Sequence, residues 1–507
     1  MKIIRALIFL FVAGGPSVTV ANAGKDTGSC GSNISVQRTS EYLITADDRV
    51  VKILQPHFFG FNIEWIGFQE DLWDSNLLAV KPEVISALQA IPGAVYRYPG
   101  GTLANHFDWR ASLGPYGSRP LRRAVNWRGP LITHFGFYEY LDFVATVGGQ
   151  SWIVPNLYGD FIGETGVSEL TSQAGQWAAA ALKSGAKVLR WELGNELDRN
   201  PYQWPPEKYS ARALEVAKEI RVNDPSSRFV SFLQDYDAQP RITASAYNTI
   251  TSKMLESLAP DHALHLYYDG APGGPPIPNR LRHLCGSSAV IQAAVGYPAK
   301  IWVTEHARWP AGKSTDSEWK KNWYKTNNLE GALSVADMVI ALSQIPNVEG
   351  AFLHSLAGTS GPWPLFHRTS SGLRPSAVYW GLRVLRDSML DHVLVTQTNS
   401  RNDSGYTGSY DIRASLLTNS NRSKFVLWAV NRTGKEGKIG MSLSMLAGKN
   451  ILARLITLSD TNPEANNTLD GQRILPRDQT INLTFDKGGR AMSVLPPYSI
   501  SAIIISN

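Results

Sequence analysis

Residues 188–200 have the sequence VLRWELGNELDRN, and this stretch decides the fold. It begins as a short apolar run and continues into Gly194, Asn195 and Glu196. Such a run predicts a buried strand that delivers an amide and a carboxylate at its carboxyl end. Enzymes built on a parallel barrel carry their chemistry at that end of the strands. The stretch therefore predicts one strand of a parallel barrel together with part of its active site.

A second apolar run, residues 300–304, leads into Glu305 in the same way. About three βα repeats separate Glu305 from Glu196, which places the two glutamates on the seventh and fourth strands of an eight-stranded barrel. Side chains from these strands face each other, so the carboxyl groups can lie about 5 Å apart. That spacing is typical of glycosidases that retain the configuration of the sugar. It predicts Glu196 as the acid/base and Glu305 as the nucleophile.

The two roles demand different ionisation states. A general acid needs a raised pKa, and we expect an apolar, aromatic-lined strand end to raise the pKa of Glu196. The alternative for Glu196 is a solvated loop glutamate. A nucleophile must stay ionised, and neighbouring Arg and Tyr side chains would lower the pKa of Glu305. Asn195 would point into the same pocket and hold a sugar hydroxyl.

From residue 58 onward, short apolar runs alternate with helical patterns such as 172–184 and 206–223. This alternation is typical of βαβ units and of a parallel sheet. We expect eight barrel strands, at residues 58–65, 94–98, 152–157, 188–193, 229–233, 263–267, 300–304 and 350–354. The eighth helix is expected at residues 377–390. The predicted fold class is α/β, with a (β/α)₈ TIM barrel.

Beyond residue 390 the pattern changes to short strands separated by Gly, Asn and Ser turns, which is typical of an all-β sandwich. Residues 35–54 are rich in β-branched side chains and predict two further strands that pack on that sandwich. We therefore expect four parts in the chain. They are a signal peptide at 1–23, an N-terminal arm with strands at 24–56, the catalytic barrel at 57–390 and a C-terminal β-sandwich domain at 391–507.

The first residues have the pattern of a secretory signal peptide. Lys2 and Arg5 precede an apolar stretch at residues 6–14, and the small residues Ala21 and Ala23 flank Asn22 at a cleavage site. No later apolar run is long enough to span a bilayer. The sequence thus predicts a secreted or periplasmic protein with no membrane attachment after cleavage.

The chain contains two cysteines, Cys30 and Cys285, which could pair or stay as free thiols. No Cys/His cluster has metal-ligand spacing, so we expect no metal site and no cofactor. The net charge is +6, and basic tracts interleaved with aromatic residues are absent, which argues against nucleic acid as a partner. Five arginines follow the second expected strand and form either a basic rim for an acidic polysaccharide or a solvated loop. They are Arg110, Arg119, Arg122, Arg123 and Arg128.

Several other expected strand ends carry polar or aromatic side chains. Arg97 could pair with Glu305, and Tyr267 could donate a hydrogen bond to it. His265, taken alone, is more often a satisfied core histidine than a catalyst. Trp309 and Trp363 could stack on sugar faces or simply pack. Glu64 ends the first expected strand.

Together these segments resemble the clan A glycoside hydrolases, most closely family 51, the α-L-arabinofuranosidases. The resemblance lies in GFNIE at residues 60–64, RYPGG at 97–101, DW at 108–109, VPNLYG at 154–159, GNELD at 194–198 and HLY at 265–267. It implies a barrel with an added sandwich domain, Glu196 as acid/base and Glu305 as nucleophile. It also implies that Asn195 and Arg97 support them and that Glu64 and Tyr267 hold the sugar or the nucleophile.

Two positions depart from the family pattern. Thr102 follows the PGG turn where the family usually has Asn, and Thr304-Glu305-His306 replaces Asp-Glu-Trp. These departures keep the clan mechanism and leave the sugar open. The alternatives are a β-glucuronidase or heparanase of family 79, another exo- or endo-glycosidase of the clan such as family 39, and a non-catalytic carbohydrate-binding protein. The expected partner is a polysaccharide or oligosaccharide, and the resemblance leaves open a homo-oligomer.

Overall fold

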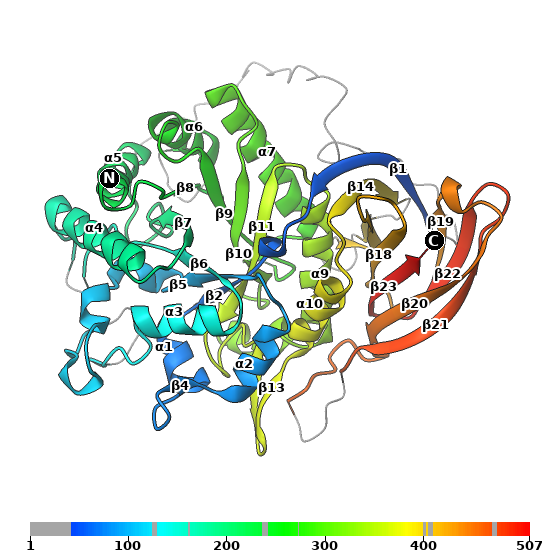
Figure 1. Ribbon diagram of the computed structural model, residues 1–507, viewed down its shortest axis with the longest axis horizontal. Helices are drawn as coiled ribbons and strands as arrows, with labels where there is room; N and C mark the ends of the chain where they lie inside the picture. Colours follow the sequence, from blue (N-terminus) through cyan, green and yellow to red (C-terminus); the bar gives the residue numbers. More distant parts are fainter. Residues whose placement is uncertain are drawn as a thin grey trace, which may run out of the picture.

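The computed structural model describes residues 42–123, 129–160, 163–235, 242–271, 273–398, 402–403, 409–468 and 474–506. Eight parallel strands close a barrel in the order β10-β11-β2-β5-β6-β7-β8-β9, which confirms the predicted fold class (Figure 1). The strands are β2 (Phe59–Ile63), β5 (Val95–Tyr98), β6 (Gln150–Ile153), β7 (Val188–Leu193), β8 (Phe229–Phe232), β9 (Asp261–Tyr268), β10 (Ile301–Arg308) and β11 (Val348–Leu356).

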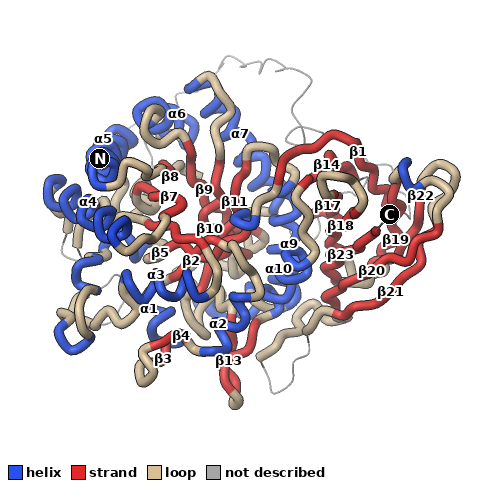
Figure 2. Tube along the Cα trace, viewed as in Figure 1, coloured by secondary structure: helices blue, strands red, loops and turns tan. Residues whose placement is uncertain are grey.

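Helices surround the barrel strands, as Figure 2 shows in blue around red. The longer ones are α2 (Pro82–Gln89), α3 (Phe137–Thr146), α4 (Val167–Lys183), α5 (Pro206–Asn223), α6 (Ala244–Leu255), α7 (Ile277–Val295), α9 (Leu329–Ser343) and α10 (Ala377–Asp387). Short helical turns are η1 (Pro56–Phe58), α1 (Trp65–Gly67), η2 (Phe68–Leu72), η3 (Thr102–His106), η4 (Trp109–Ser112), η5 (Tyr116–Ser118), α8 (Ser317–Lys321), η6 (Trp323–Thr326) and η7 (Ser444–Leu446). Small two-stranded ladders are β3 (Trp73–Asp74) with β4 (Ala79–Val80), β12 (Phe366–Thr369) with β13 (Gly372–Pro375), and β15 (Asn402–Asp403) with β16 (Ser409–Tyr410).

Large apolar side chains fill the inside of the barrel and form the floor of the site. Trp152 of β6, Trp302 of β10 and Phe352 of β11 are almost fully buried and belong to one cluster. The ring centroids of Trp152 and Trp302 lie 5.0 Å apart. Gly60 of β2 leaves the room that the Phe352 ring occupies, because a Cβ there would lie 2.2 Å from it. Dense packing of this kind excludes water below the catalytic face.

A nine-stranded sheet follows the barrel, on the right of Figure 1, in the order β21-β20-β23-β18-β17-β14-β1-β19-β22. Its two ends share one apolar core, since Leu483 of β21 and Ala491 of β22 lie in the same buried cluster, so the sheet curls into two layers. The strands are β1 (Tyr42–Ile53), β14 (His392–Thr398), β17 (Ile412–Thr418), β18 (Lys424–Asn431), β19 (Gly437–Ser442), β20 (Asn450–Ser459), β21 (Arg477–Thr484), β22 (Arg490–Leu495) and β23 (Ser499–Ser506).

The N-terminal part of the sheet is described from residue 42 onward. Residues 42–53 form one strand, β1, and residues 35–41 of the stretch predicted to hold two strands lie outside the described residues. The pairing of β1 with β14 shifts register between Ala46 and Val50. The division of the chain after residues 23, 56 and 390 stays a prediction. The expected signal peptide lies outside the described residues. Cys285 is disulfide-bonded, and the other cysteine of the sequence, Cys30, lies outside the described residues.

Helix α9 lies between the barrel and the sheet and is buried along its whole length. Asp337 of α9 pairs with Arg413 of β17 and with Arg432 beyond β18. Arg432 also pairs with Asp269, which follows barrel strand β9, at 2.7 Å. These buried ion pairs join the sheet to the catalytic barrel through hydrogen-bonded charges.

Lys52 of β1 fastens the first strand to the end of α9. Its Nζ donates hydrogen bonds of 2.7–2.9 Å to the carbonyl oxygens of Leu342, Ile345 and Val348. Lys52→Met should therefore lower the free energy of unfolding by about 2–4 kcal/mol, because it removes three hydrogen bonds that a buried ammonium group donates. Urea unfolding measures this loss. Lys438→Met on neighbouring β19, where the lysine is exposed, is the control and should change stability by less than about 0.5 kcal/mol. Equal stability of the two variants would contradict the prediction.

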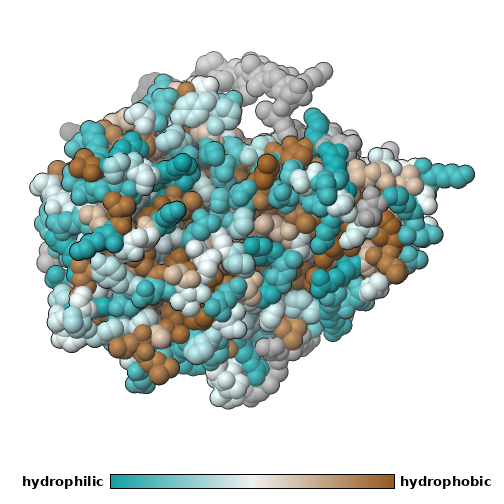
Figure 3. All heavy atoms as spheres, viewed as in Figure 1, coloured by the Kyte–Doolittle hydropathy of each residue, from teal (hydrophilic) through white to brown (hydrophobic). Residues whose placement is uncertain are grey.

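The surface of the viewed face intermixes hydrophilic and hydrophobic residues (Figure 3). Among the described residues, the search for a helix both long and apolar enough to span a bilayer finds no candidate.

Candidate active site

The carboxyl ends of the barrel strands bring the residues predicted for the site into one cluster. Glu64 follows β2, Arg97 lies in β5, and Asn195 with Glu196 follows β7. The remaining residues lie on the neighbouring strands or just beyond them. They are His265 and Tyr267 in β9, Glu305 in β10, Trp309 after β10 and Trp363 after β11.

Tight backbone turns place the two carboxylates. Gly194 has φ +80° and Glu196 φ +47°, so the chain reverses sharply directly after β7. A non-glycine residue in this region is strained, and such strain concentrates at functional sites. Gly101 lies against both Glu305 and Glu64, because a Cβ there would lie 3.1 Å from an oxygen of each. A glycine here leaves room for both carboxylates, and the PGG turn forms a wall of the site.

Glu305 lies within β10 rather than beyond its end. The pairing of β10 with β9 shifts register between Trp302 and Glu305, and such an irregularity re-aims a side chain. Arg97 Nη1 donates to Glu305 Oε1 at 2.8 Å, and Tyr267 Oη donates to Glu305 Oε2 at 2.7 Å. Burial disfavours the charged carboxylate, but the charges of His265, His354 and Arg97 outweigh it and lower the pKa of Glu305. The group is thus anionic, as a nucleophile must be.

A second buried carboxylate, Glu192 of β7, lies directly behind this pair. Arg97 donates to it through Nε at 2.8 Å and Nη2 at 2.7 Å, and Trp152 Nε1 donates at 2.7 Å. Burial opposes its ionisation, yet the charge of Arg97 and the hydrogen bonds from His265 and Arg97 lower the pKa of Glu192 to about 2. Sequence reasoning missed Glu192, although a lone glutamate inside an apolar barrel strand is the pattern that could have revealed it.

Two cationic donors hold Glu196, and one of them was not predicted. Arg199 Nη1 and His265 Nδ1 each lie 2.7 Å from Glu196 Oε1. Burial favours the neutral acid, but the charge of Arg199 and the hydrogen bond from His265 lower the pKa of Glu196 to about 2. The expectation of a raised pKa is wrong for this state of the site, because the strand end is not apolar: Arg199 folds back onto it.

His265 lies among three carboxylates. Its Nδ1 faces Glu196, and its Nε2 lies 3.1 Å from Thr304 Oγ1. Burial alone lowers the pKa of a histidine, but Glu305, Glu192 and Glu196 raise that of His265 to about 9. The histidine is therefore an imidazolium at neutral pH and part of the site. The proton in the Glu196–His265 hydrogen bond is bound to the histidine in this state.

Glu64 is a third carboxylate at the mouth of the site. Burial raises the pKa of Glu64, and His354 of β11 partly offsets this from 3.8 Å. His354 also lies 3.8 Å from Glu305 Oε2. Sequence reasoning did not predict His354, because only the closure of the barrel brings β11 beside β2. Thr102, the departure from the family pattern, begins the turn η3 just after Gly101.

Aromatic rings line the site on the side of β9 to β11. The ring of Tyr267 lies 5.4 Å from Trp309 and 5.3 Å from Trp363, centroid to centroid. Trp363 Nε1 donates to the carbonyl oxygen of Arg308 at 2.7 Å, which fixes its ring. Both tryptophans are partly exposed, so each has a face available to a sugar. His106 and Tyr202, hydrogen-bonded at 2.7 Å, lie on the side of Glu196.

The geometry alone would admit a cation among Glu196, His265 and Glu305, whose ligand atoms all lie within 4.8 Å of one another. His265 Nδ1 already donates to Glu196, and the guanidinium groups of Arg97 and Arg199 lie against the two carboxylates. A second cation would meet their charge repulsion. The absence of a metal and of a cofactor stays a prediction.

Three of the five arginines after β5 pair with carboxylates of the chain. Arg119 is buried, pairs with Glu139 at 2.6 Å and donates to the carbonyl oxygen of Gly114. Arg110 and Arg122 both contact Asp108. Arg128 lies outside the described residues.

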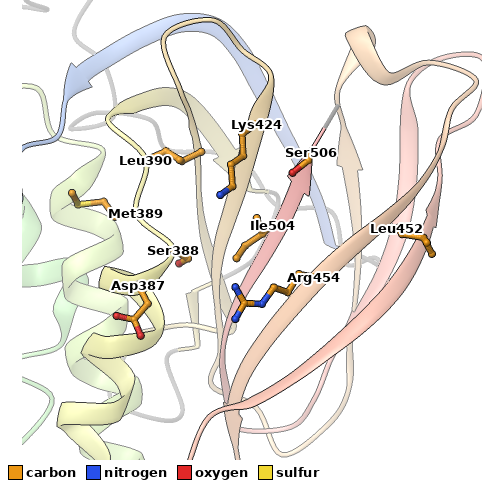
Figure 4. A pocket seen from close by; sticks show the side chains of 9 residues that line it. All are labelled: Asp387, Ser388, Met389, Leu390, Lys424, Leu452, Arg454, Ile504 and Ser506. Carbon is orange, nitrogen blue, oxygen red and sulfur yellow. The ribbon is translucent and has the colours of Figure 1, made fainter. Parts of the chain in front are cut away.

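A second hollow, of about 270 Å³, lies between the end of α10 and the sheet (Figure 4). It contains Asp387, Lys424 and Arg454 but no pair of carboxylates. Arg454 pairs with Asp478 on the exposed sheet surface. This hollow therefore lacks the groups for glycosidic cleavage that the barrel provides.

The chain is similar in sequence to known proteins. A family model described as the alpha-L-arabinofuranosidase 1 domain matches residues 87–169. An intracellular exo-alpha-(1->5)-L-arabinofuranosidase of Streptomyces lividans is 24% identical to this chain, and the match covers 89% of this chain and 73% of that protein. Alpha-L-arabinofuranosidase C of Emericella nidulans is also 24% identical, over 46% of this chain and 51% of the fungal protein.

Solved structures show the same fold. The alpha-L-arabinofuranosidase of Thermotoga maritima, in an arabinose complex, has a TM-score of 0.76 at 18% identity, covering 92% of this chain and 100% of that one. The family 51 arabinofuranosidase of Xanthomonas axonopodis pv. citri has a TM-score of 0.75 at 16% identity, with the same coverage.

The comparisons correct one prediction and identify the class of protein. The expectation of a secreted or periplasmic protein is wrong, because relatives from Streptomyces lividans, Halalkalibacterium halodurans and Bifidobacterium longum are named intracellular. The family model matches part of the barrel, and the named relative from Streptomyces lividans matches most of the chain. The chain is a glycoside hydrolase that resembles the family 51 α-L-arabinofuranosidases.

Proposed function

We propose that this glycoside hydrolase is a retaining α-L-arabinofuranosidase that removes arabinofuranosyl residues from oligosaccharides or polysaccharides. One observation carries the proposal: an ionised glutamate, Glu305, lies within 4.8 Å of a second carboxylate, Glu196, across a closed barrel. Inverting glycosidases separate their carboxyl groups by about 6.5–9.5 Å, to leave room for a water molecule. The separation here leaves no such room and favours direct attack by the protein.

The proposed reaction has two displacements. Glu305 attacks the anomeric carbon, the bond from that carbon to the leaving oxygen breaks, and Glu196 gives its proton to that oxygen. Water then attacks the same carbon, Glu196 takes a proton from the water, and Glu305 leaves. Arg97 and Tyr267 hold the nucleophile by both oxygens, and His265 donates a hydrogen bond to Glu196.

The burial of the site supports removal of single terminal sugars. Only 3% of Glu305 and 17% of the Glu196 side chain are exposed, so little of either reacting group is open to solvent. Gly101 lies against Glu64 and Glu305, and the rings of Trp309 and Trp363 lie 5.5 Å apart, centroid to centroid. Enclosed reacting groups of this kind favour a small ligand such as one terminal sugar over the middle of a long chain. The name of the Streptomyces lividans relative, an exo-acting enzyme, agrees with this proposal.

The alternative of a uronic-acid substrate has less support. The arginines expected to attract an acidic sugar, Arg110, Arg119 and Arg122, are paired with carboxylates of the chain itself. The alternative of a binding protein without catalysis also has less support, because sugar recognition alone does not need an ionised carboxylate buried between an arginine and a tyrosine. A homo-oligomer stays a prediction.

Hydrolysis of a panel of aryl glycosides tests the proposed function. The panel contains the α-L-arabinofuranoside, β-D-glucuronide, β-D-xyloside and β-D-glucoside, with Glu305→Ala as the blank. We expect turnover of the arabinofuranoside at least about 100-fold above the others, a difference of about 2.7 kcal/mol in transition-state stabilisation. Exclusive turnover of the glucuronide would show that the substrate is a uronic acid rather than arabinofuranose. It would also favour the basic rim as the feature that attracts this substrate. Turnover of none of the four would contradict exo action on these sugars.

A further inference from the structure

Arg199 contacts the acid/base carboxyl directly and has no part in the reaction as described so far. It lies in the turn after β7, three residues beyond Glu196. Its Nη1 lies 2.7 Å from Glu196 Oε1, and its Nη2 donates to Asp235 Oδ1 just beyond β8. The guanidinium group is therefore held between two carboxylates, and the Asp235 side chain is only 1% exposed. A guanidinium group that bridges two carboxylates in this way is fixed in orientation as well as in charge.

The two donors to Glu196 reach the same oxygen. His265 Nδ1 also lies 2.7 Å from Oε1 of Glu196. Among the described residues, no hydrogen bond is made to Oε2 of Glu196. A carboxyl that two donors hold by one oxygen presents the other oxygen in a fixed direction, so Oε2 is the atom left to exchange a proton with the leaving group.

Several charges face the Glu196 carboxyl. Arg199, His265 of β9 and Arg97 of β5 favour its ionised form, and Glu305 of β10 opposes it. Two carboxyls lie behind Arg199: Asp235, and Asp198, whose pKa burial raises to about 7. The phenol of Tyr202 lies on the remaining side. Arg199 is the charge closest to the acid/base that a substitution can remove without touching Glu305.

We propose that Arg199 is a positioning residue: it holds the acid/base by Oε1, leaves Oε2 free for the proton transfer, and sets the pH range over which the transfer runs. The inference rests on the proposed function and adds to it a residue and an atom. The acid/base must carry a proton when the glycosidic bond breaks, so activity falls as the pH rises through the pKa of the Glu196–His265 pair. A cation at 2.7 Å lowers that pKa. Loss of the cation must therefore move the basic limb of the pH profile to higher pH.

The test measures kcat/KM against pH for the whole protein with two substrates of the sugar that it cleaves. One has a good leaving group, 2,4-dinitrophenol, which departs without a proton, and one has a poor leaving group, phenol. Arg199→Met should move the basic limb upward by about one pH unit. The substitution should also lower kcat/KM about tenfold more for the phenyl substrate than for the dinitrophenyl substrate, because only the phenyl substrate needs the acid.

Two further variants test the direction in which the basic limb moves. Arg199→Lys keeps the charge and should leave the limb within about 0.3 pH units of the wild type. Asp235→Asn removes the counter-charge of Arg199, so the remaining cation stabilises the carboxylate more and the limb should move to lower pH. Opposite shifts in Arg199→Met and Asp235→Asn cannot arise from a general loosening of the site. If Arg199→Met does not fold, the downward shift in Asp235→Asn decides the question.

Arg190→Met is the matched control, because Arg190 pairs with Asp261 at the opposite end of the same strand, β7. It should lower thermal stability and leave the basic limb unmoved. The inference would be overturned if the basic limb of the pH profile did not move in Arg199→Met, or if kcat/KM fell equally for both leaving groups. Failure of the proposed function has a different outcome: the wild type would cleave no arabinofuranoside, or Glu196→Ala would lose equally on both leaving groups.

Discussion

Glu305→Ala should lower kcat on the preferred aryl glycoside by about four to six orders of magnitude, as loss of a nucleophile does in other covalent mechanisms. The variant keeps the site's binding groups and its acid/base, yet nothing else within reach of the anomeric carbon is an ionised carboxylate held by an arginine and a tyrosine. Steady-state kinetics on the purified variant, checked by intact mass to exclude wild-type protein, measures the loss.

The fold should survive this change. Arg97 loses one of its partners but keeps the bidentate contact with Glu192, so no buried charge is left alone. Glu139→Gln is the matched control, because Glu139 also pairs with an arginine but lies outside the site. It should change kcat less than about twofold. Turnover of Glu305→Ala within about tenfold of the wild type would remove Glu305 from the mechanism.

Arg97→Met should destabilise the protein by about 3–5 kcal/mol and abolish activity, because it leaves Glu192 and Glu305 buried without their cation. The side chains of Arg97 and Glu192 are fully buried, so water cannot replace the lost contacts. Equilibrium unfolding in urea, monitored by far-UV circular dichroism, measures the loss of stability.

A second substitution separates stability from chemistry in this network. Arg97→Met leaves the charge of Glu192 without its cation, and the double variant Arg97→Met/Glu192→Gln removes that charge as well. The double variant should therefore recover at least about half of the lost stability. It should stay inactive, because Glu305 still lacks the guanidinium that holds it. Recovery of activity along with stability would show that Arg97 serves the fold alone.

The catalytic face was predictable from the chain because its parts follow strand ends. The α5 bounds, residues 206–223, and the β7 bounds, residues 188–193, agree with the prediction to the residue. Glu196 follows β7, and Glu305 lies within β10 because a register shift lengthens that strand's inward-facing part. A sequence pattern can place a residue at a strand end, because the strand and the turn after it are both formed by residues that are adjacent in the sequence.

The ionisation of the site was not predictable in the same way. The low pKa of Glu196 depends on Arg199, and the turn geometry that folds Arg199 back onto it has no local sequence pattern. Glu192, His354 and Asp235 join the site only through barrel closure, which brings together elements far apart in the chain. β19, GKIGMS, has two glycines and little alternation, and its place is fixed by pairing with β1 and β22.

Helix α9 illustrates the same limit for the fold. Its residues are apolar all round, without the one-sided pattern of a surface helix, because it lies between the barrel and the sheet. Three of its four polar residues, Glu330, Ser334 and Asp337, contact arginines of other elements. A pattern on α9 alone could not show which arginines these are.

The most direct test of the account is to trap the sugar on the protein. Glu196→Ala, given the 2,4-dinitrophenyl glycoside of the preferred sugar, should form the glycosyl-enzyme quickly and hydrolyse it slowly, because the leaving group needs no acid while the water still needs a base. Peptide mass spectrometry of the quenched reaction should then find one glycosyl residue on the peptide that contains Glu305. A label on another residue, or rapid turnover with no covalent species and inversion at the anomeric carbon, would contradict the central claim that Glu305 is the nucleophile of a retaining glycosidase.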